Sequence, residues 1–280
     1  MGAVAVSVRE TITQLRHRSY SDFLMPSRLD AYRASLEGAL AAGYTVISLE
    51  RLAAIIGAGG PDPADRLLVL RHDIDTDPGT AAAMWAIDRD LGVGTSYLFR
   101  LSTLDLDLMA EISAGGCHAS YHYEELATVA KRRGLRDRVA LLAHLPEARD
   151  LFGRHVDALR ARTGLPIRVV AAHGDFVNRR LGVANQEILA DPAFRRTTGI
   201  DFEAYDEALL ELIPDRYIDV TYPRYWSPAD PAEAIARHAP IVQVLVHPRH
   251  WRVARATNAR DDLRRLAEGL RFAIPFPRGG

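Results

Sequence analysis

The sequence contains a single cysteine, Cys117, in 280 residues, which excludes an internal disulfide and favours a reducing compartment. It lacks an excess of charge, because 35 basic and 36 acidic side chains give a net charge of −1. Composition therefore gives no reason to expect nucleic-acid binding or attraction to an anionic membrane. No apolar run approaches the roughly 18 residues of a membrane span, and no basic segment precedes the short apolar run near the N-terminus. We expect a cytoplasmic protein without a membrane span.

What is present is a regular alternation of short apolar runs with longer helical segments. Hydrophobic residues make up 48% of the chain, enough for a sizeable core, and no linker or repeat divides it. Alternation of this kind is typical of parallel βαβ units in one domain. A helix is expected near 182–190. The predicted strands are 44–49, 66–75, 93–101, 117–123, 167–173, 217–220 and 241–247.

The apolar run at 66–75 ends in His72, Asp73 and Asp75. Alternate residues of a strand share a face, so Asp73 and Asp75 point the same way, roughly 6.5–7 Å apart. One carboxylate of such a pair can bind a metal while the other moves a proton. The alternative is that both aspartates cap the following helix, although Asp77 before Pro78 explains that helix start better.

Histidines stand at the ends of three further predicted strands: His122, His173 and His247. In a barrel of parallel strands all C-terminal ends lie on one face, so these residues converge with Asp73 and Asp75. His173 could complete a metal site or contact substrate. His247, a histidine without metal, is suited to protonating a leaving group.

His118 and His122 are four residues apart, a spacing that on a helix would allow both to bind one metal ion. On a strand the two lie about 13 Å apart, too far to share one ion with Zn–N bonds of roughly 2.0–2.1 Å. Only His122, nearer the strand end, is a candidate ligand.

Three motifs in this order resemble those of the polysaccharide deacetylases, the NodB-like carbohydrate esterase family four. They are RHDID at 71–75, GCHASYH at 116–122 and LVHP at 245–248, with GYTVISLERL at 43–52 similar to the segment that often precedes the first motif. The first motif is closest to the branch that reads Arg-His-Asp-Val-Asp. The similarity covers roughly residues 30–252.

The resemblance implies an α/β fold, a distorted (β/α) barrel, and metal-dependent hydrolysis of an N-acetyl or related acyl group. It implies Asp73 as general base, His247 as general acid, and Asp75 and His122 as metal ligands. The expected organisation is one catalytic domain over 1–280, with an N-terminal extension at 1–27, the barrel at 28–252, and a C-terminal helix and tail at 253–280.

Two positions depart from the family pattern. Leu126 stands where the family usually has a second metal-binding histidine, and HGD at 173–175 replaces the family's Arg-x-Pro motif. His173 is therefore our candidate for the third ligand, with water or a substrate atom as the alternative. The divalent metal is expected to be Zn, with Co, Ni, Fe or Mn as other options.

The leading hypothesis is a deacetylase of an amino sugar or glycoconjugate, with a small-molecule or glycan substrate. The alternatives are a hydrolase of a non-sugar amide or cyclic C–N bond, and a degenerate barrel that binds a glycan or protein without catalysis. The sequence does not define an oligomeric state. The residues assigned to the substrate pocket are His72, Asp175, Asp219, Trp226 and Trp251, with Asp219 also placed to orient His247.

Overall fold

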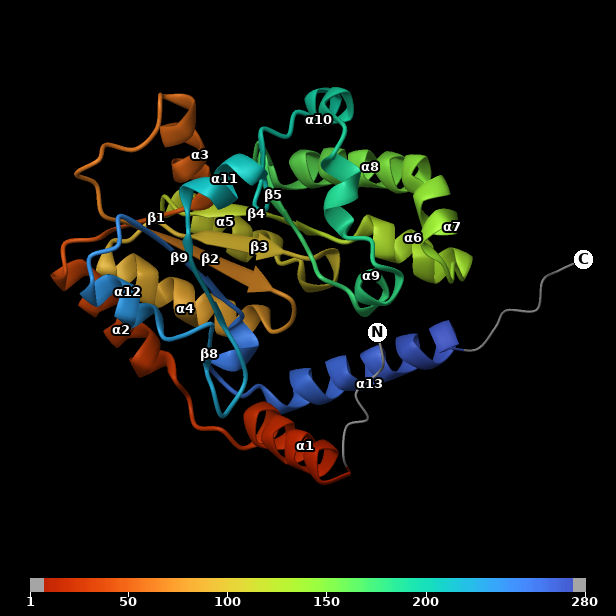
Figure 1. The fold of residues 1–280 in the computed structure, drawn as a ribbon, viewed down its shortest axis with the longest axis horizontal. Helices are drawn as coiled ribbons and strands as arrows, with labels where there is room; N and C mark the ends of the chain where they lie inside the picture. The colour runs from red at the N-terminus through yellow and green to blue at the C-terminus, as the bar shows by residue number, and fades with distance from the viewer. Residues whose placement is uncertain (1–7, 274–280) are drawn as a thin grey trace, which may run out of the picture.

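A curled β-sheet forms the centre of the protein in the computed structural model, which describes residues 8–273 (Figure 1). Its strands run in the order β6-β5-β4-β3-β2-β9-β7-β8, with β1 also paired to β2. All pairs are parallel except β7 with β8. The strands are β1 (Thr45–Ile47), β2 (Leu67–Ile74), β3 (Ser96–Phe99), β4 (His118–Tyr123), β5 (Val169–Ala172), β6 (Phe202–Glu203), β7 (Asp215–Asp219), β8 (Trp226–Ser227) and β9 (Ile241–Val246).

This arrangement confirms the predicted α/β fold, a distorted (β/α) barrel. Strands β2 to β6 lie side by side in chain order, each reached through at least one helix, and β9 returns to the other side of β2. No pair joins β6 to β8 within residues 8–273, so the sheet is a half-barrel that stays open. Because β2, β3, β4, β5 and β9 are parallel, their C-terminal ends lie at one edge of the sheet.

Helices cover the outside of the sheet. They are α1 (Val8–Phe23), α2 (Leu29–Ala41), α3 (Leu49–Gly57), α4 (Pro78–Leu91), α5 (Leu106–Ala114), α6 (Glu125–Arg133), α7 (Arg138–Ala143), α8 (Leu145–Thr163), α9 (Phe176–Leu181), α10 (Pro192–Thr198), α11 (Glu207–Leu212), α12 (Pro231–Ala236) and α13 (Arg255–Ala273), with 3₁₀ turns η1 (Leu101–Thr103), η2 (Asn185–Leu189) and η3 (Pro248–His250).

The helix expected near 182–190 was wrongly placed. The side chain of Asp175 accepts from the backbone N–H of Val177 and starts α9 earlier. Gly182, at φ +63°, then ends α9 in the left-handed conformation that glycine adopts without strain. Only the 3₁₀ turn η2 follows in the expected range.

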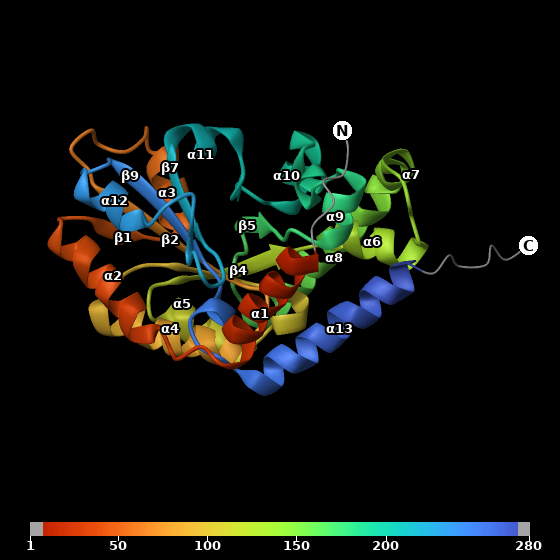
Figure 2. The ribbon, with the colours of Figure 1, turned by 60° about the horizontal axis from the view of Figure 1, so that its bottom comes forward.

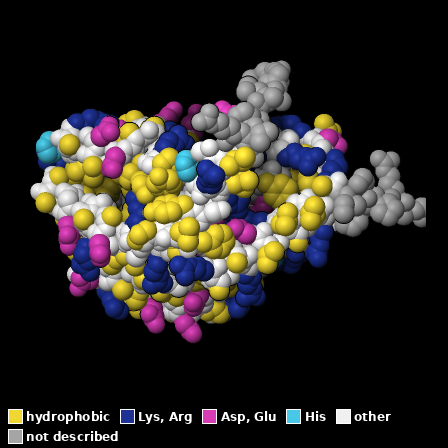
Figure 3. Space-filling model, turned by 90° about the horizontal axis from the view of Figure 1, so that it is seen from below, with side chains coloured by type: hydrophobic (Ala, Val, Ile, Leu, Met, Phe, Trp, Pro, Cys, Tyr) yellow, Lys and Arg dark blue, Asp and Glu magenta, His cyan; other side chains and the backbone are white. Residues whose placement is uncertain are grey.

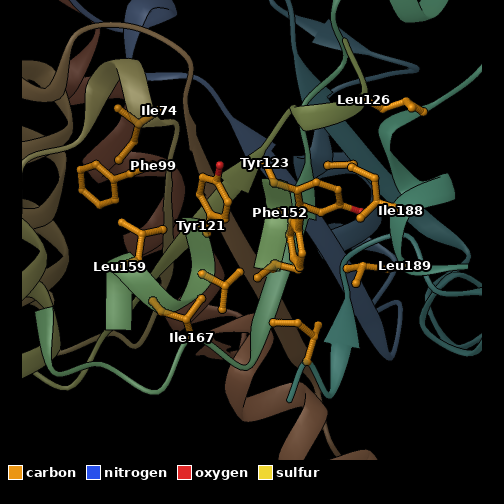
Figure 4. Close-up of a cluster of buried hydrophobic side chains, with 14 of the residues drawn as sticks. Ile74, Phe99, Tyr121, Tyr123, Leu126, Phe152, Leu159, Ile167, Ile188 and Leu189 are labelled. Carbon is orange, nitrogen blue, oxygen red and sulfur yellow. The ribbon is translucent and has the colours of Figure 1, made fainter. Parts of the chain in front are cut away.

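The largest hydrophobic cluster lies between the sheet and helices α5, α6 and α8 (Figure 4). Phe152 is fully buried there, with its ring centroid 5.0 Å from that of Tyr123 and 6.2 Å from that of Tyr121. Leu126, on α6, is also fully buried in this cluster. Strand β2 is buried along its whole length, as the apolar run predicted.

Helices α1 and α13 run alongside one another at the edge of the molecule, below the sheet in Figure 1 and in front of it in Figure 2. They fall within the predicted N-terminal extension (1–27) and C-terminal segment (253–280), of which residues 1–7 and 274–280 lie outside the described part of the chain. None of the helices in residues 8–273 combines the length and apolar character needed to cross a bilayer.

Candidate active site

Arg71 and Asp73 lie on one face of strand β2 because they are two residues apart, and Asp75 follows directly after the strand end. Nε and Nη2 of Arg71 donate to the two carboxylate oxygens of Asp73, both at 2.6 Å. Burial raises the pKa of Asp73, but the Arg71 guanidinium outweighs burial and the resulting pKa lies below the usual range. Asp73 is therefore ionised at neutral pH and fixed in orientation by a bidentate partner.

Asp75, His122 and His173 bring three ligand atoms together at the ends of β2, β4 and β5. Oδ1 of Asp75 lies 3.3 Å from Nε2 of His122 and 2.9 Å from Nδ1 of His173. The two imidazole nitrogens are 3.2 Å apart. A tetrahedral ion with bonds of about 2.0–2.1 Å places its ligand atoms about 3.3–3.4 Å apart. The three atoms thus have the spacing of one face of such a site.

The surroundings of these three atoms also fit a cation. Nδ1 of His122 lies 3.0 Å from the carbonyl oxygen of Ala171, so this nitrogen donates and Nε2 keeps the lone pair that a metal needs. Oδ1 of Asp75 is buried and, within residues 8–273, accepts no hydrogen bond of good geometry. Burial raises the pKa of Asp75, but the imidazoles of His173 and His122 outweigh it and hold the pKa well below its usual range.

Asp73 lies directly beside this group, with Oδ2 3.4 Å from Nε2 of His122. The ligand group therefore offers two nitrogens and one oxygen, a donor set that suits Zn²⁺ and related divalent ions with a position left open.

His247 follows β9 and is held by Asp219 at the end of β7. Nδ1 of His247 lies 2.7 Å from Oδ1 of Asp219, and its backbone N–H donates to Oδ2 at 2.8 Å. Nε1 of Trp251 donates to the same Oδ2 at 2.9 Å, and Nδ1 of His250 lies 3.0 Å from Oδ1. Burial lowers the pKa of His247, but the Asp219 carboxylate outweighs it and raises the pKa to about 9. His247 thus carries a proton at neutral pH.

Two adjoining cavities of about 490 and about 570 Å³ open over this group. Asp73, Asp75 and His247 line both, so they are two arms of one space at the C-terminal edge of the sheet. Helix α1 contributes Arg18 to one arm, and α13 contributes Arg265 to both. The two helices therefore form a wall of the cavity.

Of the five residues assigned to the substrate pocket, the structure places some at the cavity and others away from it. Asp175 lines the cavity and pairs with Lys131 at 2.8 Å. Asp219 lies behind His247, and the buried Trp251 supports it. Trp226 packs against Trp251, with ring centroids 5.8 Å apart, and borders other hollows instead.

His72 points to the opposite face of β2 from the two aspartates, as the strand alternation predicts. It is fully buried, with Nε2 2.8 Å from the hydroxyl of Tyr32 and Nδ1 3.0 Å from the carbonyl oxygen of Ser96. Its ring stacks on Tyr97 at 4.0 Å. The structure does not bring His72 to the cavity, because these contacts hold it in the core behind the sheet.

Two cavity residues, Tyr205 and Arg100, and the fully buried Arg71 behind them were not assigned a role from the sequence. Arg71 holds Asp73, and the hydroxyl of Tyr205 lies 3.2 Å from Nη2 of Arg71. Arg100 donates to the backbone oxygen of Asp75 at 3.2 Å and pairs with Glu124. The signal for Arg71 was available: it shares a strand face with Asp73 two residues away.

Comparison with known proteins gives matches among solved structures alone, since no family model and no curated protein matches the sequence. The deacetylase PplD of Streptococcus pyogenes in complex with acetate is 13% identical, with a TM-score of 0.44 over 88% of this chain and 91% of that one. IcaB from Ammonifex degensii is 17% identical, with a TM-score of 0.46 over 85% and 94%.

A CE4 family pseudoenzyme from Bacillus anthracis is 13% identical, with a TM-score of 0.39 over 74% of this chain and 63% of that one. The descriptions of these structures thus include a deacetylase and a CE4 family member, the family that the sequence motifs resemble. Identities this low do not transfer an activity, so the residues of this chain have to support any function.

Proposed function

We propose that this protein is a metal-dependent hydrolase that removes an N-acetyl or related acyl group from an amino sugar or glycoconjugate. The observation that carries the proposal is the meeting of Asp75, His122 and His173 beside an ionised Asp73 and a protonated His247 in one cavity. The sugar substrate rests on the resemblance of the motifs, and a cytoplasmic location rests on the single buried cysteine.

Asp75, His122 and His173 are the residues that would hold the metal, most simply Zn²⁺. When bound, a divalent cation supplies Lewis-acid chemistry, lowering the pKa of a water and polarising an acyl oxygen.

Asp73 is assigned the role of general base. Its carboxylate is ionised, lies beside the ligand group, and is prevented from rotating by the two hydrogen bonds from Arg71. Each oxygen keeps a second lone pair, so Asp73 can accept a proton from a water that attacks the acyl carbon.

His247 is assigned the role of general acid. Asp219 holds Nδ1, so Nε2 is the nitrogen left to donate a proton to the departing amine. A base that is ionised and an acid that is protonated at the same pH form the pair that amide hydrolysis needs. A barrel that only binds a glycan or protein has no requirement for this pair, which favours catalysis.

The test is metal content by elemental analysis together with acetate release from N-acetylglucosamine oligomers. Wild type should contain one divalent ion per chain, and Asp75→Ala, His122→Ala and His173→Ala should each lose it. Asp73→Asn should keep the metal and lose turnover. His238→Ala, at an exposed histidine after α12, is the matched control and should change neither.

Metal lost in His122→Ala but kept in His173→Ala would return His173 to the substrate pocket. No metal in wild type after reconstitution would refute the hydrolase.

A further inference from the structure

Over most of its length helix α13 turns polar side chains toward the protein and leucines outward, and the buried Phe272 near its end is the exception. Asp261 and Glu268 line the cavity, and Asp262 is partly buried beside them. Leu263, Leu266 and Leu270, which repeat at helical spacing, are 68%, 60% and 56% exposed. A surface helix of a soluble domain normally shows the reverse, with its apolar stripe facing the core.

Helix α1 has the same orientation. Asp22 is buried and Arg18 lines the cavity, whereas Ile12 and Leu15 are 46% and 59% exposed. The outward apolar side chains of α13 therefore continue onto a second helix.

The two helices are antiparallel neighbours joined through their polar sides. Nη2 of Arg18 lies 2.8 Å from Oδ1 of Asp262, and Nδ2 of Asn258 donates to the backbone oxygen of Asp22 at 2.7 Å. Figure 3, which views the molecule from below, shows hydrophobic side chains exposed among Arg and Lys. We call the outward side of α1 and α13 the roof face, defined by Ile12, Leu15, Leu263, Leu266 and Leu270.

The exposed charges of α13 are of one sign. Its acidic residues are all partly buried, while its exposed charged side chains are Arg255, Arg260, Arg264, Arg265 and Arg271. With five arginines against three acidic residues, α13 has a net charge of +2. Arg264 and Arg265 pair with Glu268 and Asp261 of the same helix and line the cavity. Arg255, Arg260 and Arg271 therefore supply the local positive charge beside the exposed leucines.

We propose that the roof face binds the surface of a bilayer that contains anionic lipid. Leucines on one side of a helix and arginines beside them are the pattern of helices that lie in the interface, with the apolar chains among the acyl groups and the guanidinium groups at the phosphates. In this orientation the cavity lies on the protein side of α1 and α13, and the membrane lies on their other side.

A second copy of the chain fits this face less well. A two-fold interface sets the same patch against itself, so the arginines of α13 would oppose one another without exposed acidic partners on that helix. An anionic lipid surface supplies the opposite charge.

The test is co-sedimentation of the full chain with phosphatidylcholine vesicles that contain about 30% phosphatidylglycerol. Wild type should bind these vesicles more tightly than pure phosphatidylcholine, and salt should weaken the binding. Combined Leu263→Gln, Leu266→Gln and Leu270→Gln should reduce partitioning at least about tenfold. Arg260→Gln and Arg271→Gln should each reduce it about fivefold on anionic vesicles.

Val139→Gln is the matched control, since Val139 is 78% exposed on α7, and it should leave binding unchanged. Thermal melting and metal content should match wild type in every variant, because the changed side chains are exposed and outside the ligand group. Wild type that fails to bind anionic vesicles overturns the proposal. The proposal is also overturned if light scattering shows that wild type is a dimer and that the triple leucine variant is a monomer. Vesicle binding needs no catalysis, so loss of the proposed hydrolase would leave this result interpretable.

Discussion

His247 should titrate far above an ordinary histidine, and Asp219→Asn should remove most of that difference. The pKa of His247 is about 9 against an ordinary value of 6.5, a gap of about 2.5 pH units or roughly 3 kcal/mol. The Asp219 carboxylate, with Oδ1 2.7 Å from Nδ1, is the main group that raises it. With an uncharged asparagine at this position, burial remains and the pKa should fall to about 6.5 or lower.

The proposed role of His247 as general acid determines whether activity falls or rises with pH. Activity requires the protonated imidazole, so it should be present below the pKa of His247 in the metal-loaded enzyme and decline as pH rises through that pKa. A bound cation lowers this pKa below the metal-free value of about 9. In the metal-free protein at pH 8, Asp219→Asn should lower the protonated fraction from about 90% to about 3%, so the decline in turnover of the metal-loaded variant should occur at a lower pH than in wild type.

The measurement is NMR titration of the imidazole Cε1–H signals in the metal-free protein, with His247→Gln to identify the signal. Metal-free protein is used because a bound cation would itself lower the pKa of His247. His250→Gln is the control, since His250 contacts Asp219 but not Nδ1 of His247, and the pKa should stay near 9. A wild-type pKa near 6.5, or one that Asp219→Asn leaves unchanged, would refute the assignment.

Three further substitutions test the packing around the site by chemical denaturation. Arg71→Met leaves the buried Asp73 carboxylate without its bidentate partner and should lower the free energy of unfolding by about 3–5 kcal/mol. A loss below about 1 kcal/mol, the size expected for a surface ion pair, would contradict the assignment of Arg71 and Asp73 as a buried ion pair. Leu126→His places a polar ring in the hydrophobic cluster against which α6 packs, so it should lower the free energy of unfolding by at least about 2 kcal/mol and leave metal affinity unchanged. Tighter metal binding would show that a side chain at this position reaches the metal site. Phe152→Ala should cost about 3–5 kcal/mol, and a smaller loss would mean that the cluster closes over the cavity left behind.

The strands were predictable because their signals are local. Apolar runs bounded by glycine, proline and charged residues located β2, β4, β5 and β9 to within about two residues. Asp73 lies on β2 and Asp75 follows directly after it, and both line the cavity. The parallel topology then implied that the strand ends converge. The helix expected at 182–190 failed because cap chemistry at Asp175 and Gly182, rather than apolar periodicity, defines α9.

The outward face of α13 was beyond sequence reasoning for a different reason. The spacing of Leu263, Leu266 and Leu270 is typical of a buried stripe, and only the three-dimensional packing shows that the acidic side of the helix takes the inner position. Likewise His72 belongs to the first motif, yet strand alternation sends its ring into the core. Membership of a motif did not predict contact with the cavity.

Arg71 can orient Asp73 because both residues lie on strand β2, two positions apart. In a strand the residue two positions before Asp73 shares its face, at a Cα separation of roughly 6.5–7 Å, which a long arginine side chain spans. The bidentate contact shows that it does so here, with both partners buried. A carboxylate and the cation that orients it need no distant element to align them when both come from one strand. His173 lies directly after β5, with Nδ1 2.9 Å from Oδ1 of Asp75. With His173 as the proposed third ligand, the site needs no ligand from α6, where Leu126 is buried in the hydrophobic cluster.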